Sequence, residues 1–430
     1  MHLRFIGHAA FVLETAGIGL LCDPWFSERV FHDGWSLYSP VTVTLDDMPE
    51  VDHLWISHEH PDHFHLPTLR AFSAERRSSL KLLFQETVDR RVIDFCSKLG
   101  FGEVVELSPE WISLNSRTEI LCLPHSEGNS WAAVRSGGIT ILNLNDCGIR
   151  HPEELEQVRE LVGDLDLLLT QFSYAHWVGN PDQPELRRSA ALEKLEMVAL
   201  QCQVLRPKQV IPFASQMYFS HPENFFLNDE ANLPSAAVDY LSEHTDCEPV
   251  VLYNGEAFDV GRGHDTTAAC EQYAIDRSEV LAKGPVGGPS TRSVSMEDLV
   301  DQASGFAARL AKDSLWYLRR LIRPAHIFLW DHEVSVMMTT DGIVTSRVPE
   351  GQCDVSLHSE SLLLCLQQRW GLDTLGVSGR MHKPPGGNYQ RFYRLFRPGM
   401  IAMRGNRVGF AYVFRSLVNQ VLVRFGRRSN

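Results

Sequence analysis

Several features that mark particular classes of protein are missing from this chain of 430 residues. Its nine cysteines are scattered, with no pair at Cys-x-x-Cys spacing, which is typical of reduced thiols rather than of a disulfide framework. No apolar run approaches the roughly 20 residues that span a bilayer, and no basic segment followed by an apolar run opens the chain. We therefore expect a cytoplasmic protein with no membrane span.

Positive charge is also scarce. Forty Lys and Arg residues face 54 Asp and Glu residues, which gives a net charge of -14, and the basic residues form no dense stripe. Nucleic acid is therefore a poor candidate partner. A hydrophobic content of 44% is typical of a globular protein, and the length exceeds one ordinary core. We expect more than one domain.

Three histidines and an aspartate occupy six consecutive positions, His58-Glu59-His60-Pro61-Asp62-His63. They follow the β-branched and aromatic run 51–57, which predicts a buried strand, and they precede apolar residues at helical spacing. Imidazole nitrogens and carboxylate oxygens are good ligands for Zn²⁺ and Fe²⁺. A single histidine at such a place would most simply be a solvated loop residue. For this spacing after an apolar strand, the sequence predicts a metal site.

This turn resembles the signature of the metallo-β-lactamase fold, an αββα sandwich with metal ions at one edge. Segments 4–10, 22–25 and 66–69 are similar to the L-ascorbate-6-phosphate lactonase-like branch. Segments 35–38, 145–147 and 212–214 are similar to the metal domain of CMP-N-acetylneuraminate hydroxylase. The resemblance covers roughly the first three-fifths of the chain and implies an α/β fold that begins with this sandwich.

The resemblance also implies two divalent metal ions, Zn or Fe, and a ligand set. The residues that it assigns to the metals are His58, His60, Asp62, His63, His125 and Asp146. One ion would be bound by His58, His60 and His125, and the other by Asp62 and His63. Asp146 follows a predicted buried strand and would bridge both ions. Asp62 and Asp146 are therefore also the candidate catalytic residues.

The chain departs from the lactonase-like branch at one ligand. Ala214 stands where that branch has a final metal-binding histidine, and His221 is the nearest replacement. Either His221 completes the second metal site from a longer loop, or that site is more open than usual. The alternative for His221 is a turn histidine before Pro222.

Five further residues are candidates for substrate binding: His8, Asp23, Tyr174, His176 and Trp177. The resemblance implies that His8 and Asp23 lie near the metals, although each is also an ordinary turn residue. The aromatic and polar stretch that ends in Trp177 follows an apolar strand. We interpret it as lining of the pocket, with ordinary loop packing as the alternative.

The domain boundaries follow from changes in pattern. We expect a metal-binding catalytic domain over 1–261, a linker over 262–295 that includes the Gly- and Pro-rich stretch 284–290, and an α+β accessory domain over 296–430. Ser295 is a predicted helix N-cap, with Asp298 as its partner and Pro324 as the end of the helix.

The leading hypothesis for function is a binuclear metallohydrolase. It would act on a small-molecule lactone, ester, amide or phosphodiester through a metal-bound hydroxide. One alternative is a di-iron, oxygen-activating hydroxylase. The sequence lacks the Cys and His pairs of a Rieske cluster, so that enzyme would need a separate electron donor protein. A non-catalytic, metal-dependent binding protein is the third hypothesis, because of Ala214.

Overall fold

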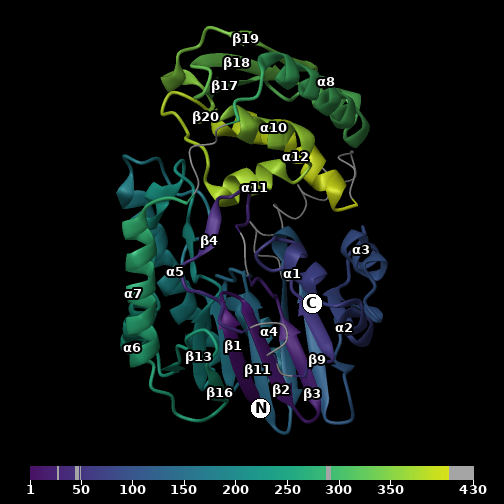
Figure 1. Cartoon of the computed structure of the whole chain (residues 1–430), viewed down its shortest axis with the longest axis vertical. Helices are drawn as coiled ribbons and strands as arrows, with labels where there is room; N and C mark the ends of the chain where they lie inside the picture. The colour runs from purple at the N-terminus through teal and green to yellow at the C-terminus, as the bar shows by residue number, and fades with distance from the viewer. Residues whose placement is uncertain (27–28, 44–47, 49, 287–291, 406–430) are drawn as a thin grey trace. The chain divides into compact units, whose positions relative to one another are not determined.

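The computed structural model describes residues 1–26, 29–43, 48, 50–286 and 292–405 (Figure 1). The chain forms two compact units. The first comprises residues 1–220 and 225–286, and the second comprises residues 221–224 and the chain after residue 286.

The linker predicted over 262–295 is contradicted by helix α7 (Thr267–Lys283), which belongs to the first unit. Tyr273 of this helix is fully buried, and its hydroxyl donates a hydrogen bond of 2.9 Å to the carbonyl oxygen of Leu252. The helix therefore packs on the core of the first unit, which extends to residue 286 rather than 261. Most of the Gly- and Pro-rich stretch lies outside the described residues.

The described strands of the first unit form two seven-stranded sheets and a two-stranded one. The first sheet, in the order β16-β1-β2-β3-β5-β6-β7, contains β1 (His2–Gly7), β2 (Ala10–Thr15), β3 (Ile18–Cys22), β5 (His53–Ile56), β6 (Lys81–Gln85), β7 (Glu103–Leu107) and β16 (Ala257–Asp259). The second, in the order β15-β13-β12-β11-β10-β9-β8, contains β8 (Ile112–Ser113), β9 (Thr118–Pro124), β10 (Ser130–Ser136), β11 (Ile139–Asn145), β12 (Leu167–Gln171), β13 (Gln209–Phe213) and β15 (Glu248–Pro249). The small sheet pairs β4 (Trp35–Leu37) with β14 (Met217–Phe219).

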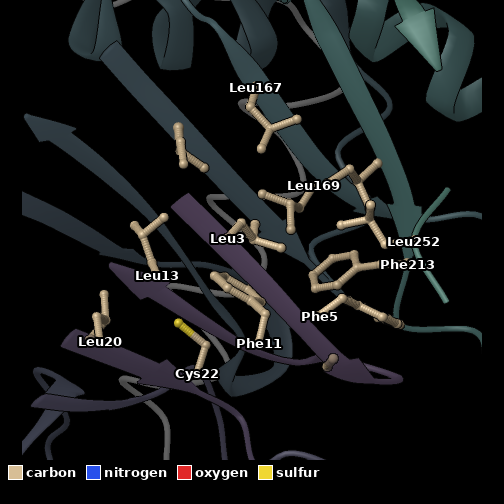
Figure 2. Close-up of a cluster of buried hydrophobic side chains, with 14 of the residues drawn as sticks. Leu3, Phe5, Phe11, Leu13, Leu20, Cys22, Leu167, Leu169, Phe213 and Leu252 are labelled. Atoms are coloured by element: carbon tan, nitrogen blue, oxygen red, sulfur yellow. The ribbon is translucent and has the colours of Figure 1, made fainter. Parts of the chain in front are cut away.

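The inner faces of the two large sheets pack against each other. Leu3 and Phe11 of the first sheet share one buried cluster with Leu169 and Phe213 of the second (Figure 2). The rings of Phe11 and Phe213 meet edge to face at 6.3 Å between centroids, a favourable aromatic geometry. Burial of these apolar surfaces is the main force that holds the sheets together.

Helices cover the outer face of each sheet, because those faces are also apolar. The first sheet buries its outer residues against α1 (Leu66–Ala71) and α3 (Arg91–Leu99), and the second against α4 (Pro152–Val162), α5 (Pro184–Leu205) and α6 (Pro234–His244). The unit also contains α2 (Ala74–Ser79) and the short 3₁₀ helices η1 (Ser126–Gly128) and η2 (Phe225–Asn228). The predicted αββα sandwich is confirmed.

Parallel pairing determines where the functional side chains collect. Strands β3, β5 and β6 are parallel in the first sheet, and β11, β12 and β13 are parallel in the second. The carboxyl ends of parallel neighbours lie at one edge of their sheet. Asp23 follows β3, the histidine-rich turn follows β5, and Asp146 follows β11. The strands thus carry these polar residues to strand ends rather than into the core.

The second unit has α+β composition. Its described strands form a sheet in the order β19-β18-β17-β20, from β17 (Ala325–Leu329), β18 (Val334–Thr339), β19 (Gly342–Ser346) and β20 (Val355–Leu357). Its helices are α8 (Met296–Asp313), α9 (Trp316–Arg319), α10 (Ser359–Gln367), α11 (Gly371–Ser378), α12 (Tyr389–Met403) and the 3₁₀ helix η3 (Glu350–Gln352). No helix in the described part of the chain combines the length and apolar character that crossing a membrane requires.

Candidate metal centre

The histidine-rich turn is held in place by its backbone. The carbonyl oxygen of Ser57 accepts hydrogen bonds from Gln85 Nε2 at 3.0 Å and from Ser130 Oγ at 2.5 Å. The N–H of His63 donates to the carbonyl oxygen of His60 at 3.0 Å, which closes the turn. His65 then caps helix α1 through its contact with the N–H of Thr68. Both ends of the turn are therefore fixed by neighbouring elements.

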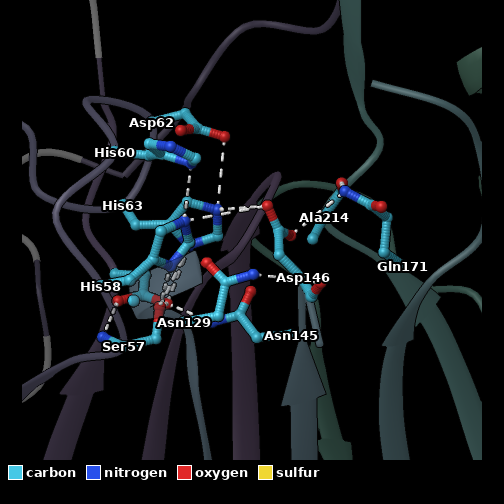
Figure 3. Close-up of polar contacts among 12 residues, drawn as sticks. Ser57, His58, His60, Asp62, His63, Asn129, Asn145, Asp146, Gln171 and Ala214 are labelled. Atoms are coloured by element: carbon cyan, nitrogen blue, oxygen red, sulfur yellow. Dashed lines mark hydrogen bonds and ion pairs between the residues drawn. The ribbon is translucent and has the colours of Figure 1, made fainter. Parts of the chain in front are cut away.

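Two groups of side chains in the described chain have potential metal ligands within 4.8 Å of one another. One consists of His8, Asp62 and His63. The other consists of His58, His63 and Asp146 (Figure 3). His63 belongs to both groups. His60 adjoins the second group, because its Nδ1 lies 3.0 Å from Nε2 of His58. The turn and the end of β11 thus converge on one place.

Asp146 lies between the two central imidazoles. Its Oδ2 is 3.5 Å from Nε2 of His63 and 3.8 Å from Nε2 of His58. Asp62 reaches His63 from the other side, with its Oδ2 3.3 Å from the same Nε2. His8 Nε2 is 3.2 Å from that Asp62 oxygen. This order of groups places carboxylates and imidazoles alternately.

Asp23 and Ser57 orient the imidazoles. Asp23 Oδ2 accepts hydrogen bonds from Ser57 Oγ at 2.7 Å and from Nδ1 of His63 at 2.9 Å. Because the Ser57 proton goes to Asp23, its Oγ accepts from Nδ1 of His58 at 2.9 Å. Both rings therefore direct Nε2 towards the carboxylates, in the tautomer that binds metals.

Unpartnered atoms at this site fit a bound cation. Nε2 of His63 and Oδ1 of Asp62 are fully buried without a hydrogen-bond partner. Buried polar atoms without partners are rare in folded proteins, and an ion is one of their ordinary explanations. The donor set of imidazole nitrogens and carboxylate oxygens suits Zn²⁺ or Fe²⁺. The residues present therefore fit a metal centre.

Without ions, the cluster balances its charge by proton uptake. Burial alone would lower the pKa of His63, but the surrounding carboxylates, Asp62 most strongly, raise it well above the usual value. Burial would raise the pKa of Asp146, yet the charge of His63 outweighs this and lowers that pKa to about 2. Burial and the neighbouring imidazoles lower the pKa of His58. Carboxylates that stay ionised at neutral pH are ready to bind cations.

Four non-glycine residues at these strand ends have backbone φ angles in the left-handed region. The angles are 52° at His8, 40° at Asp23, 51° at Asn145 and 52° at Ala214. Such angles are unfavourable for residues with a Cβ, and they concentrate at functional sites. The N–H of Ala214 donates to the carbonyl oxygen of His8 at 2.9 Å. His8 thus lies next to the position where the lactonase-like branch has its final histidine.

Sequence reasoning missed two residues behind Asp146. Gln171 Nε2 donates to Asp146 Oδ1 at 3.1 Å, and Nζ of Lys194 donates to Gln171 Oε1 at 2.5 Å. Burial lowers the pKa of Lys194 to about 8. The polar residue at the end of apolar β12 was a usable signal for Gln171. Lys194 gave none, because it lies in the middle of helix α5 and has no turn or strand end beside it.

His125 and His221 belong to neither group. His125 Nε2 is 3.0 Å from Glu154 Oε1 in α4, and its Nδ1 is 3.1 Å from Ser126 Oγ, so both nitrogens of this ring are engaged away from the turn. His221 falls in the short segment assigned to the second unit, where its Nδ1 accepts from the N–H of Glu223 at 3.2 Å. Their roles as ligands stay predictions that this geometry does not support.

The candidate substrate residues differ in position. His8 and Asp23 are fully buried at the metal centre, where both contact ligand candidates. Tyr174 is buried, and its hydroxyl donates to the carbonyl oxygen of Leu227 at 2.5 Å. His176 is exposed and Trp177 is partly buried, in the loop after β12. Of the five, His8 and Asp23 have contacts that suit the metals rather than a substrate.

Comparison with known proteins gives a family match and several relatives. Residues 2–214 match the family model described as a beta-lactamase superfamily domain. A putative Rieske 2Fe-2S iron-sulfur protein of Mycolicibacterium smegmatis is 26% identical over 250 residues, which are 55% of this chain and 47% of that protein. Cytidine monophosphate-N-acetylneuraminic acid hydroxylase of Mus musculus is 24% identical over 278 residues, 61% of this chain and 47% of that protein. The chain spans about half the length of the curated relatives it matches.

Solved structures give similar coverage. A metallo hydrolase from the archaeon Ignicoccus hospitalis is 20% identical, with a TM-score of 0.41 over 60% of this chain and 98% of that one. The diiron beta-hydroxylase CmlA of Streptomyces venezuelae is 19% identical, with a TM-score of 0.42 over 60% of this chain and 54% of that one. Through residues 2–214, the chain belongs to the beta-lactamase superfamily and has the metallo-β-lactamase fold.

Proposed function

We propose that the first unit is a metal-dependent catalytic domain with a two-ion centre, and that it hydrolyses a small-molecule lactone, ester, amide or phosphodiester. The observation that carries the proposal is the joint convergence of the two ligand groups on His63, with Asp146 between two imidazoles. A structural cluster of this size would satisfy the hydrogen bonds of its own polar atoms, whereas here Nε2 of His63 and Oδ1 of Asp62 are buried without a hydrogen-bond partner.

The ligand assignment starts from the two groups, adds the adjoining His60 to the group of His58 and Asp146, and gives the shared His63 to the other group. His58, His60 and Asp146 would hold one ion, and His8, Asp62 and His63 the other. Asp146 would serve both ions, since its Oδ2 lies near Nε2 of both His58 and His63, while its Oδ1 accepts a hydrogen bond from Gln171. His8 would take the place of the metal-binding histidine that the lactonase-like branch has at the position of Ala214. His125 and His221 are in neither group, and their roles as ligands rest on the sequence alone.

When bound, two such cations lower the pKa of a water molecule and polarise the scissile group. The protein contributes the rest. Asp23 and Ser57 fix the imidazoles in one tautomer. Gln171 keeps Asp146 turned towards the histidines. The buried walls around His63 exclude bulk water, which strengthens electrostatic interactions at the centre.

The second candidate function is oxygen activation at a di-iron centre. The curated relatives favour it, since their names include a cytidine monophosphate-N-acetylneuraminic acid hydroxylase and putative Rieske proteins. The His- and carboxylate-rich donor set suits iron as well as zinc. This reaction would require electrons from a separate donor protein, because the chain has no Cys and His pairs of Rieske type.

Metal analysis separates the candidates. The full-length protein is expressed without added metal and its Zn and Fe content per chain is measured, together with oxygen uptake under reductant and hydrolysis of lactone, ester, amide and phosphodiester probes. The hydrolase proposal predicts metal-dependent cleavage of one probe class that a chelator abolishes. Two irons per chain with reductant-dependent oxygen uptake would refute it in favour of the oxygenase. A folded protein that takes up no metal would refute both.

A further inference from the structure

A small hollow in the first unit lies beside the strand ends that carry the metal centre. Its lining includes Ser173 and Tyr174 after β12, Ser215 after β13, Tyr38 after β4, and Arg277 of α7. It has room for about one water-sized group. Gln171, which contacts Asp146, is two residues from Ser173, and Ala214 adjoins Ser215. The hollow and the metal centre therefore share two loops.

Arg277 brings an uncompensated positive charge to this hollow. Among the residues that the structure describes, its guanidinium donates one hydrogen bond, from Nη2 to the carbonyl oxygen of Asn228 at 2.6 Å, and forms no ion pair. The adjacent Asp276 is engaged elsewhere, by the hydroxyl of Tyr253 at 2.6 Å and by Gln272 Nε2 at 2.7 Å. A largely buried guanidinium without a carboxylate is unfavourable unless an anion completes its hydrogen bonds.

Two phenols accompany this charge. Tyr38 is 4% exposed, and its hydroxyl is buried without a hydrogen-bond partner. Burial raises the pKa of both Tyr38 and Tyr174, and the charge of Arg277 opposes the rise at each. The two hydroxyls therefore remain protonated beside the guanidinium. An unpaired O–H donor next to an unpaired cation is a donor set for an anionic oxygen.

We propose that Arg277 and Tyr38 bind a carboxylate group of the ligand whose reacting part lies at the metal centre. Arg277 supplies the charge and a two-donor edge, and Tyr38 donates its unpaired hydroxyl proton. The size of the hollow fits one carboxylate oxygen inside and the other at its mouth. The proposal rests on the proposed function only in taking this ligand as the substrate. Binding of the carboxylate does not depend on the metals.

Acetate and acetamide are suitable probes, because they have the same shape and differ in charge. The full-length protein is titrated with each at constant ionic strength, maintained with chloride, and the thermal unfolding midpoint is followed. We expect acetate to raise the midpoint and acetamide to leave it unchanged. Arg277→Met should weaken the apparent affinity for acetate by at least about tenfold, as loss of a charged hydrogen bond does. Lys283→Met is the control, since it removes an exposed charge from the same helix.

Tyr38→Phe and Arg277→Lys provide the test if Arg277→Met does not fold. Tyr38→Phe should weaken acetate binding by about fivefold or more without loss of stability, because it removes only an unpaired hydroxyl. Arg277→Lys should give an intermediate affinity, since an ammonium lacks the two-donor edge. Equal acetate responses in wild type, Tyr38→Phe and Arg277→Lys would overturn the proposal.

The same titration after removal of metal by a chelator distinguishes this proposal from the proposed function. An acetate response that persists in the stripped protein and is lost in Arg277→Met supports the carboxylate site whatever the metal centre does. A response that vanishes on stripping and persists in Arg277→Met would place acetate on the metals and overturn the proposal. A protein that binds no metal but retains the Arg277-dependent response would refute the proposed function alone.

Discussion

Asp23→Asn tests whether Asp23 orients the imidazoles of the candidate metal centre. Oδ2 of Asp23 accepts hydrogen bonds from Ser57 Oγ, His63 Nδ1 and Asn145 Nδ2, and Oδ1 accepts from the N–H of Ser57. Asparagine has nearly the same shape and tolerates the φ of 40° at this position. It offers one oxygen instead of two. The substitution therefore changes hydrogen bonding with little steric disturbance.

The loss of stability follows from the number of hydrogen-bond donors that lose an acceptor. If the amide oxygen takes the Oδ2 position, the N–H of Ser57 faces an NH2 group, and an unpaired buried donor costs about 1–3 kcal/mol. The remaining hydrogen bonds lose the contribution of the negative charge, about 1 kcal/mol each. Removal of a buried charge recovers part of this, so we expect the free energy of unfolding to fall by about 2–4 kcal/mol. Metal affinity should fall about 10- to 100-fold, as loss of such outer partners generally does.

Urea unfolding measures the first quantity, and competition with a chromophoric chelator measures the second. Asp52→Asn is the matched control, because Asp52 accepts hydrogen bonds from the N–H of Gly19 and from its neighbour His53 while it is half exposed. We expect a change in stability of less than about 1 kcal/mol and no change in metal affinity for this control. If Asp23→Asn binds metal as tightly as wild type, Asp23 does not orient His63 and the reasoning is refuted.

Three further predictions concern the centre. His8→Ala should lower the metal content by one ion and leave the other bound; retention of both ions would show that His8 is not a ligand. Gln171→Leu and Lys194→Met should each weaken metal binding about tenfold by releasing Asp146, whereas Gln201→Met, a buried polar change on the same helix, should not. Burial lowers the pKa of Lys194 to about 8 from 10.5. Between these two pH values the unfolded chain therefore binds more protons than the folded protein. The free energy of unfolding should thus rise by up to about 3 kcal/mol as the pH increases across this range. In urea titrations across that range, an equal rise in Lys194→Met would contradict this assignment.

The histidine-rich turn could be predicted from sequence because its signals are local. The apolar strand, a proline and alternating candidate ligands lie within 53–63 of the chain. Asp146 lies at the end of an apolar strand, and its role was predicted through the resemblance. The fold itself followed from the resemblance that this turn carries.

Contacts made by packing could not be predicted. Gln171 and Lys194 are 23 residues apart, and they meet only because α5 covers the outer face of the sheet beside β12. The direction of His125 depends on η1, which turns its ring towards Glu154. The left-handed φ at His8 has no signature in a single sequence. Tertiary context determined each of these features.

The two ends of helix α8 show the same difference between features that have a local sequence signal and features that do not. Ser295 caps α8 as predicted, with Oγ accepting from the N–H of Asp298 at 3.0 Å. The helix predicted to reach Pro324 ends at Asp313, because Ser314 leaves the helical region at φ -137° and its Oγ donates to the carbonyl oxygen of Leu310 at 2.6 Å. The cap has a local sequence pattern. The early end is an extended conformation at one residue, Ser314, which has no such pattern.

The central claim is that Asp146 links two ions held by the histidine-rich turn. Metal content per chain, measured on wild type and on Asp146→Ala after dialysis against excess Zn²⁺ and removal of free metal, tests it most directly. Asp146 is not part of the packed core, so the variant should fold with an unchanged far-ultraviolet spectrum. The account predicts two ions per chain in wild type and at most one in Asp146→Ala. Two tightly bound ions in the variant, or fewer than two in wild type, would contradict it.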